Sequence, residues 1–274
     1  MNIMMCGDSR AYVGLELVMY STLTHNKHIN WYIFTMDINF STPHGDIVFR
    51  GLDAIQKNKL RKIVAYLDPT SKITFINAAP YYAEYLQGSV NEMSEFTPYA
   101  ALRLIVDKAL PHVKDILYFD CDLAICENIE SMYYNCLQDG KYEAYATYAE
   151  DAFNGEGEMI SGIMFFNLEK CKQTHFFDTA RKNYMLNEYE FPDQMAMRDT
   201  CEIGYLPSRY GCMDDPLMTM AKPAIIHFTN NLMKIYSAPS ATYFYRKYPQ
   251  FDYVLKGLRL IDTIDLNIPV DWDE

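Results

Sequence analysis

The first half of the chain alternates short apolar runs with longer segments of helical periodicity. Strands are expected at Asn2–Cys6, Asn30–Met36, Ile73–Ile76 and Asp115–Phe119, and helices at Val13–Leu23, Leu52–Leu67 and Pro98–Leu110. This alternation predicts an α/β fold with a mostly parallel central sheet flanked by helices on both faces. Ligands bind such sheets at the carboxyl ends of the strands. The residues to inspect therefore directly follow the strands: Gly7-Asp8-Ser9, Asp37 and Asp120-Cys121-Asp122.

The second half is less regular. We expect strands at Tyr142–Tyr148 and Gly162–Asn167 and helices at Glu169–Leu186 and Pro192–Thr200. Between the two strands, Glu150–Met159 is polar and contains two glycines, which is typical of a mobile loop at a functional site. The segment after Ile235 is aromatic, and we expect it to be irregular.

The chain is strongly acidic, with 24 basic and 36 acidic side chains and a net charge of −12. A protein that binds nucleic acid needs a basic surface for the phosphates, so no nucleic-acid partner is expected. An anionic substrate would have to be bound by a metal ion or by a few placed cations, against the overall field.

Seven cysteines are present, and none of them forms a C-x-x-C pair. The odd number and the lack of a secretory signal favour reduced thiols and a cytoplasmic location. No apolar run approaches the ~20 residues that a membrane span needs.

Asp120 and Asp122 follow a strongly apolar strand, Asp115–Phe119. If the backbone stays extended, both carboxylates point to one side. Two such carboxylates supply half of a site for Mg²⁺, Mn²⁺ or Ca²⁺. A metal held there would neutralise a diphosphate and stabilise its departure. The alternative is an acidic, solvated turn, since this short pattern is common by chance.

Five segments, in order along the chain, resemble the motifs of family 8 glycosyltransferases. The stretch from Arg103 to Asp122 resembles the family's R-L helix, its (V/I)-L-Y-L strand and its D-x-D motif. The other four are Met4–Asp8, similar to the first strand and nucleotide turn; Ser161–Leu168 (SGIMFFNL), similar to N-(S/A)-G-(V/L)-(L/M)-x-x-N-L; Phe191–Gln194 (FPDQ); and Ile226–Thr229 (IHFT), similar to H-(F/Y)-x-G. The resemblance spans about residues 1–236.

This resemblance implies a GT-A fold, with a Rossmann-like sheet in a catalytic domain over residues 1–236. Residues 237–274 would form a small C-terminal appendage packed on that domain, aromatic and basic at first and then acidic. The donor would be UDP-glucose or UDP-galactose, and the anomeric configuration would be retained.

The resemblance also makes Asp120, Asp122 and His227 the ligands of a metal, Mn²⁺ with Mg²⁺ as the alternative. This agrees with the chemistry, because a neutral imidazole beside two carboxylates favours Mn²⁺ over Mg²⁺. The alternative for His227 is a hydrogen-bonded histidine of the core.

By the same resemblance, the turn Cys6-Gly7-Asp8 would hold the uracil, with Asp8 accepting a hydrogen bond from the base and Tyr12 stacking on it. The alternative is an ordinary strand-to-helix turn in which Asp8 or Ser9 caps the helix. Arg103 would reach the donor sugar or phosphates; its alternative is a helix-surface arginine. The donor site would also include Cys121, Ser161, Gly162 and Lys234.

Asp193 and Gln194 begin an expected helix, where an acidic side chain is also a favourable cap. The resemblance puts Asp193 on hydroxyls of the donor sugar and Gln194 near the anomeric carbon. Because a glutamine amide is a weak nucleophile, we expect front-face attack through an oxocarbenium-like state rather than a covalent glycosyl-enzyme.

Several departures from the family pattern lie near the expected sugar and acceptor. Ile160 replaces an asparagine, and the family's G-x-x-K-P-W segment lacks its Gly, Pro and Trp, with Lys234 one place late and Tyr236 in place of the tryptophan. The family aspartate expected in the sheet falls near Thr147, with Asp151 the nearest acid. These changes leave the identity of the sugar open.

The leading hypothesis is transfer of a hexose from a UDP-sugar to a glycan or lipid-linked acceptor, as in cell-surface polysaccharide synthesis. One alternative is a glycogenin-type enzyme that glucosylates one of its own 23 tyrosines. Another is a nucleotide-sugar-binding module with weak or lost transferase activity. The aromatic and basic residues of Tyr243–Leu260 could also make peripheral contact with the inner face of a membrane; the alternative is a helix packed on the domain.

Overall fold

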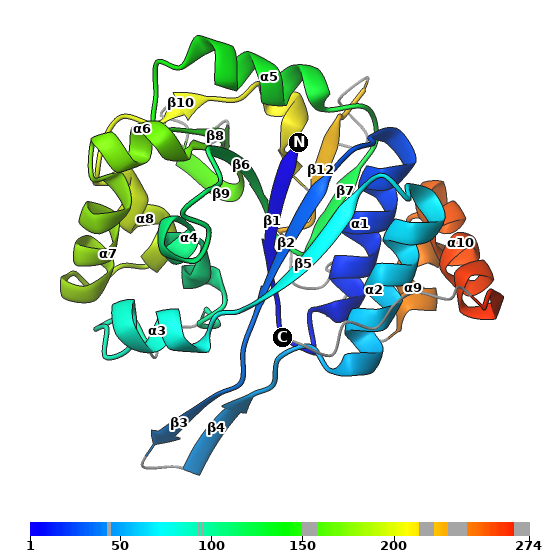
Figure 1. Cartoon of the computed structure of the whole chain (residues 1–274), viewed down its shortest axis with the longest axis horizontal. Coiled ribbons are helices and arrows are strands. Elements are labelled where there is room, and N and C mark those ends of the chain that lie inside the picture. The colour runs from blue at the N-terminus through cyan, green and yellow to red at the C-terminus, as the bar shows by residue number, and fades with distance from the viewer. Residues whose placement is uncertain are drawn as a thin grey trace.

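The centre of the fold is a seven-stranded sheet with helices on both faces (Figure 1). The computed structural model describes residues 1–42, 45–92, 94, 96–149, 158–213, 222–229 and 240–265. In order across the sheet, the strands are β10 (Gly204–Tyr205), β8 (Ala144–Ala149), β9 (Glu158–Asn167), β6 (Asp115–Phe119), β1 (Asn2–Cys6), β2 (Asn30–Thr35) and β5 (Lys72–Asn77). All pairings are parallel except those of β9, which is antiparallel to both β6 and β8.

Two smaller sheets accompany the central one. The first has the order β11 (Cys212–Met213), β12 (Ile225–His227) and β7 (Leu123–Ile125). In it, β12 runs antiparallel to β7 and pairs His227 with Leu123. The second is a hairpin of β3 (Ile38–Thr42) and β4 (Gly45–Phe49), which extends away from the central sheet (Figure 1).

Helices cover the two faces of the central sheet and enclose two apolar cores (Figure 1). One face carries α1 (Tyr12–His25), α2 (Ala54–Leu67), α5 (Glu130–Asp139), α9 (Ala241–Lys247), α10 (Asp252–Thr263) and the short 3-10 helices Ser208–Tyr210 and Pro249–Phe251. The other carries α3 (Ala79–Tyr85), the 3-10 helix Ala100–Ile105, α4 (Val106–Ala109), α6 (Leu168–Gln173), α7 (Phe176–Leu186) and α8 (Pro192–Arg198). Alternate side chains of β1 enter different cores, Ile3 and Met5 the first, Met4 and Cys6 the second. Both cores need apolar side chains, which explains the uninterrupted apolar strands.

The predicted mostly parallel sheet with helices on both faces is confirmed, but two predicted helices are wrong in detail. Pro98–Leu110 forms a 3-10 helix followed by one α-helical turn. Residues 101–106 are all buried, and Arg103 Nε donates to the carbonyl of Ala100, so this segment lacks the solvent-facing side of an amphipathic helix. Glu169–Leu186 is two helices, because His175 between them adopts a left-handed φ of 57°.

The segment after Ile235 is not irregular where the structure describes it. Ser240 caps α9 by accepting from the backbone amide of Tyr243. In α10, Val254, Gly257 and Ile261 recur at helical spacing and are buried, which is the pattern of a helix that packs on a domain. No helix in the described ranges is long and apolar enough to cross a membrane.

The loop predicted at Glu150–Met159 lies largely outside the described residues, since 150–157 are not among them. Its last two residues, Glu158 and Met159, already belong to β9. That strand therefore begins four residues before the predicted start at Gly162.

Candidate functional site

Asp120 and Asp122 lie on the turn between β6 and β7, and backbone hydrogen bonds fix this turn. The amide of Asp120 donates to the carbonyl of Gly162 on β9, at 2.9 Å. The carbonyl of Asp122 accepts from the amide of Phe228, also at 2.9 Å, directly after β12. The second bond draws the end of β12 to the turn, although the two segments are over 100 positions apart in the sequence.

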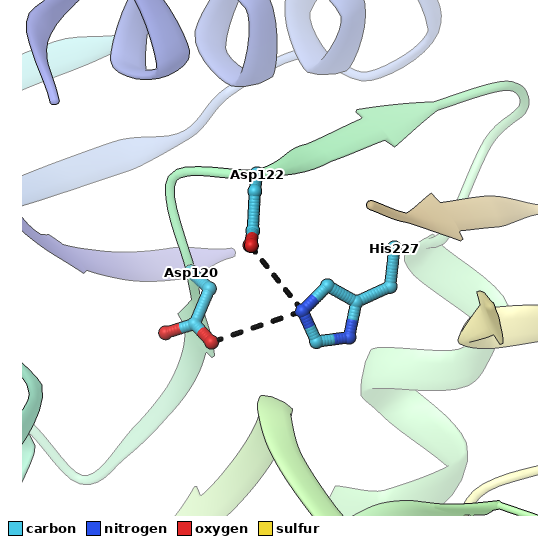
Figure 2. A group of neighbouring side chains, drawn as sticks. All are labelled: Asp120, Asp122 and His227. Atoms are coloured by element: carbon cyan, nitrogen blue, oxygen red, sulfur yellow. Dashed lines mark ion pairs between the residues drawn. The ribbon is translucent and has the colours of Figure 1, made fainter. Parts of the chain in front are cut away.

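Figure 2 shows the result: the side chains of Asp120, Asp122 and His227 point toward one another. His227 Nε2 lies 3.3 Å from Asp122 Oδ1 and 3.9 Å from Asp120 Oδ2. One ligand atom of each residue lies within 4.8 Å of the others. Asp122 and His227 are buried, and Asp120 is partly exposed. Two carboxylate oxygens and one imidazole nitrogen at this spacing suit a divalent cation.

Arg103 is not a helix-surface residue, since only 2% of it is exposed. Its Nη2 lies 2.9 Å from Asp120 Oδ1 and its Nε lies 3.0 Å from Asp193 Oδ2. Nη1 donates to the carbonyl of Ser161, and the guanidinium lies 3.9 Å from the centre of the Tyr118 ring. Burial lowers the pKa of Arg103, but the charges of Asp193 and Asp120 outweigh it and raise that pKa. The guanidinium therefore stays charged and joins Asp120 to Asp193 on α8.

Asp193 and Gln194 occupy the first turn of α8 and are both buried. Burial raises the pKa of Asp193, while the neighbouring Arg103 lowers it. Gln194 Oε1 accepts from the backbone amide of Ser161 at 3.0 Å. Because that amide is a donor, the carbonyl end of the glutamine is assigned without ambiguity. The bond to Ser161 therefore uses Oε1, and Nε2 is the other polar end of a side chain that lines the cavity.

The turn after β1 begins where Gly7 donates its amide to the carbonyl of Phe34, at 3.0 Å. The carboxylate of Asp8 accepts from the amides of Arg10 and Ala11, at 3.0 and 2.9 Å, and from Arg10 Nε at 2.7 Å. Asp8 therefore closes the turn before α1 and is not the helix cap, since the N-cap of α1 is Ala11 and has no side-chain cap bond.

Cys6 and Cys121 lie side by side next to this turn. The Cys121 thiol donates to the carbonyl of Cys6 at 3.1 Å, and burial raises the pKa of both thiols. Tyr12 is directed elsewhere: its hydroxyl donates to Glu16, one turn further along α1.

A cavity of about 800 Å³ connects these groups, a volume typical of small-molecule sites. Its walls contain most of the predicted site residues: Cys6, Gly7, Asp8, Arg103, Asp120, Cys121, Asp122, Ser161, Gly162, Asp193, Gln194 and His227. Tyr12 is not among the described lining residues, and Lys234 lies outside the described part of the chain.

The cavity also contains residues that the sequence reasoning missed: Arg10, Phe96, Tyr99, Tyr118 and Phe191. Tyr118 donates its hydroxyl to Asp120 Oδ1 at 2.6 Å. It precedes Asp120 by two positions, so strand alternation could have placed it on the same side. Phe191 stands within the FPDQ motif, which could have drawn attention to it.

Solved structures with the same fold have low sequence identity to this chain. The galactosyltransferase LgtC, in complex with donor and acceptor sugar analogs, has 14% identity and a TM-score of 0.62, with 99% of both chains covered. Mouse xyloside xylosyltransferase 1 has 13% identity and a TM-score of 0.56, covering 84% of this chain and 97% of that one. The glycosyltransferase GlyE of Streptococcus pneumoniae has 16% identity and a TM-score of 0.56, covering 93% and 63%.

These likenesses show the GT-A fold. Comparison with curated protein sequences gives no match. The family profile described as Glycosyl transferase family 8 matches residues 2–234. Because that match covers most of the chain, this glycosyltransferase belongs to glycosyl transferase family 8.

Proposed function

We propose that the chain is a retaining hexosyltransferase that moves glucose or galactose from a UDP-sugar to a glycan or lipid-linked acceptor in cell-surface polysaccharide synthesis. The observation that carries this proposal is the convergence of Asp120, Asp122 and His227 in one cavity with the turn after β1. A nucleoside diphosphate needs positive charge, and a cation at this cluster would supply it in a chain of net charge −12.

Asp120, Asp122 and His227 would hold the metal. The imidazole in the donor set favours Mn²⁺, with Mg²⁺ as the alternative. When bound, the metal would neutralise the charge that develops on the departing diphosphate. The structure supports this fit through Gly162, where a β-carbon would lie 2.8 Å from His227 Nε2 and 3.0 Å from Asp120 Oδ2. The backbone of β9 thus leaves space beside the ligand atoms.

The residues of α8 would act on the donor sugar. In this proposal Asp193, held by Arg103, accepts from the sugar hydroxyls. Gln194 Oε1 is already bonded to Ser161, so the amide Nε2 is the end that meets the sugar. An amide nitrogen is no nucleophile. This arrangement favours front-face attack, in which the acceptor hydroxyl passes its proton to the leaving diphosphate. A glycosyl adduct trapped on any protein carboxylate would contradict it.

The test is a panel of UDP-sugars, with UDP release measured with and without Mn²⁺ in the wild type and in Asp122→Asn. Mn²⁺ binding by calorimetry is the second readout, and it does not depend on turnover. We expect Asp122→Asn to lower both the Mn²⁺-dependent UDP release and the Mn²⁺ affinity. Loss of a residue that supports a metal ligand costs roughly 10- to 100-fold, and loss of a ligand itself should cost more. Glu188→Gln, which alters an exposed acid, is the matched control.

Unchanged Mn²⁺ binding and UDP release in Asp122→Asn would refute the metal assignment. UDP binding without release from any UDP-sugar would favour the binding-module alternative. A mass increase on a tyrosine peptide after incubation with a UDP-sugar would favour the self-glucosylating alternative. Peripheral membrane contact through residues 237–274 stays a prediction.

A further inference from the structure

Two phenylalanines form an apolar wall in the cavity that also contains the charged groups described above. The ring centroids of Phe96 and Phe191 lie 5.7 Å apart, with the ring planes at 54°. Phe96 is 41% exposed and Phe191 is partly exposed, so neither ring is buried in a hydrophobic core. Large apolar side chains that stay open in a ligand-sized cavity point to a ligand with an apolar surface.

Both rings of the wall belong to segments that lead into the elements of the reacting centre proposed above. Phe96 precedes the 3-10 helix that carries Arg103, and Phe191 directly precedes α8, which carries Asp193 and Gln194. The ion pair of Arg103 with Asp193, at 3.0 Å, joins these two elements. Phe191 lies three positions before Gln194 in the chain, and its contact with Phe96 brings the second ring to the same place.

A third apolar side chain of the cavity, Ile160, comes from the sheet. It lines the cavity from β9 and is followed by Ser161, whose amide holds Gln194. An asparagine at this position would offer hydrogen bonds, whereas isoleucine offers only apolar contact. Three large side chains without polar atoms, Phe96, Phe191 and Ile160, therefore line the cavity that contains Gln194.

The chemistry of the two substrates decides which of them meets this wall. The diphosphate and the hydroxyls of the donor sugar need cations and hydrogen-bonding groups, which the rest of the cavity supplies. A pyranose ring also has a face of C–H bonds, and the attacking sugar has to lie close to the anomeric carbon. We propose that Phe96 and Phe191 form the acceptor subsite, where they bind a pyranose ring of a glycan acceptor through its C–H face. This inference rests on the proposed hexosyl transfer.

The experiment uses methyl glucosides and methyl galactosides, in both anomers, as acceptors. Donor and acceptor KM are measured separately with the UDP-sugar that the wild type hydrolyses. We expect Phe96→Ala and Phe191→Ala to raise the acceptor KM by roughly two- to tenfold, the range of one aromatic contact, and to change the donor KM less. Phe96→Tyr should keep the wild-type acceptor KM, while Phe96→Leu should behave as Phe96→Ala, because leucine is apolar but has no flat face. Tyr243→Ala removes an exposed aromatic ring from α9 and is the control.

Several results would overturn the proposal. One is a donor KM that rises as much as the acceptor KM, which would assign the wall to the donor. Another is a wild type that neither glycosylates any of these pyranosides nor binds them in saturation-transfer NMR with UDP and Mn²⁺ present. A third result concerns an octyl glycoside. If its acceptor KM is lower than that of the methyl glycoside in the wild type but not in Phe96→Ala, and the KM of the methyl glycosides is unchanged in Phe96→Ala, the wall binds a lipid chain instead. Absence of Mn²⁺-dependent UDP release in the wild type would instead refute the proposed function itself. Thermal unfolding of each variant shows whether it is folded. If Phe191→Ala is unfolded, the proposal is tested with Phe96→Leu.

Discussion

A β-carbon on Gly162 would lie 2.3 Å from Cε1 of His227. No pair of non-bonded carbon atoms tolerates that separation, so β9 can pass beside the imidazole only because residue 162 has no side chain. The same β-carbon would lie 3.0 Å from Asp120 Oδ2. One glycine therefore sets the space around two of the three expected metal ligands.

We predict that Gly162→Ala weakens Mn²⁺ binding at least about tenfold, because the methyl group must displace the imidazole or the strand. Calorimetric titration of Mn²⁺ measures the effect directly. Gly88→Ala is the matched control: its φ of +82° strains alanine, but the added β-carbon meets nothing within 4 Å. That variant should lose about 1–2 kcal/mol of stability and keep its Mn²⁺ affinity. A native Mn²⁺ affinity in Gly162→Ala would show that the ligands bind the ion in another arrangement.

We predict that Arg103→Met destabilises the fold by about 3–5 kcal/mol, the cost of leaving a buried carboxylate without its partner. Asp193 carries most of this cost, because its pKa is already raised by burial and Arg103 opposes that rise. Adding Asp193→Asn should therefore recover part of the loss. The double variant should lose less free energy of unfolding than the sum of the losses in the two single variants. Urea unfolding of the wild type, the two single variants and the double variant gives the coupling free energy between the two side chains.

Arg198→Met provides the control for that cycle. Arg198 makes the same kind of pair with Asp199, at 3.2 Å, but both side chains are exposed. The loss there should stay below about 1 kcal/mol. Strictly additive effects of Arg103→Met and Asp193→Asn would mean that the two side chains do not stabilise each other.

The contacts of Arg103 also show which parts of the site can be predicted from the sequence. Asp120, Asp122 and Arg103 belong to one local motif, so strand alternation and the family resemblance suffice to place them in a site. The bond from Arg103 to Asp193 cannot be predicted in that way, because it depends on how α8 packs against a segment 90 positions earlier. The pairing of Phe96 with Phe191 has the same origin.

Other differences come from backbone details that side-chain patterns do not record. The antiparallel pair of β3 and β4 is one such detail, because β3 (INFST) has only two apolar residues and gives a weak strand signal in the sequence. The left-handed φ of His175 divides a segment that is helical in its pattern. Tyr12 has the right position to approach the nucleotide turn, yet its hydroxyl bonds to Glu16. The stacking role predicted for Tyr12 therefore stays a prediction.

The carboxyl group of Glu16 makes the free energy of unfolding depend on pH. Burial raises the pKa of Glu16 from 4.5 to about 7, while the hydrogen bond from Tyr12 and the charge of Lys59 oppose the rise. Between these two values the folded state keeps a proton that the unfolded state has released. The free energy of unfolding contributed by this group therefore falls as the pH rises from 4.5 to 7, and is constant above.

We predict that Glu16→Gln gains stability relative to the wild type as the pH rises from 5 to 8, by about 2–3 kcal/mol at most. Urea unfolding at intervals of one pH unit follows the difference. Glu188→Gln, at an exposed acid, should give a curve parallel to the wild type. A constant difference between Glu16→Gln and the wild type across this pH range would contradict the raised pKa.

The packing of α10 on α1 supplies the last prediction. A β-carbon on Gly257 would lie 1.8 Å from Oη and 2.2 Å from Cζ of Tyr20, a buried residue of α1. Alanine is the better helix former by about 1 kcal/mol, so an isolated helix would gain from Gly257→Ala. Here the methyl group must move a buried ring or separate the two helices, and overpacking of this kind costs about 1–3 kcal/mol.

We therefore expect Gly257→Ala to destabilise the protein and Tyr20→Leu to relieve much of that loss in the double variant, because leucine has no ring atoms at the contact. Leu260→Ala alters an exposed position of the same helix and should change the free energy of unfolding little. UDP release per folded molecule should stay close to the wild-type value in Gly257→Ala, since neither Gly257 nor Tyr20 is among the described residues of the cavity. A Gly257→Ala protein as stable as the wild type, with the same resistance of its C-terminal region to limited proteolysis, would mean that α10 does not hold this close contact with α1 in solution.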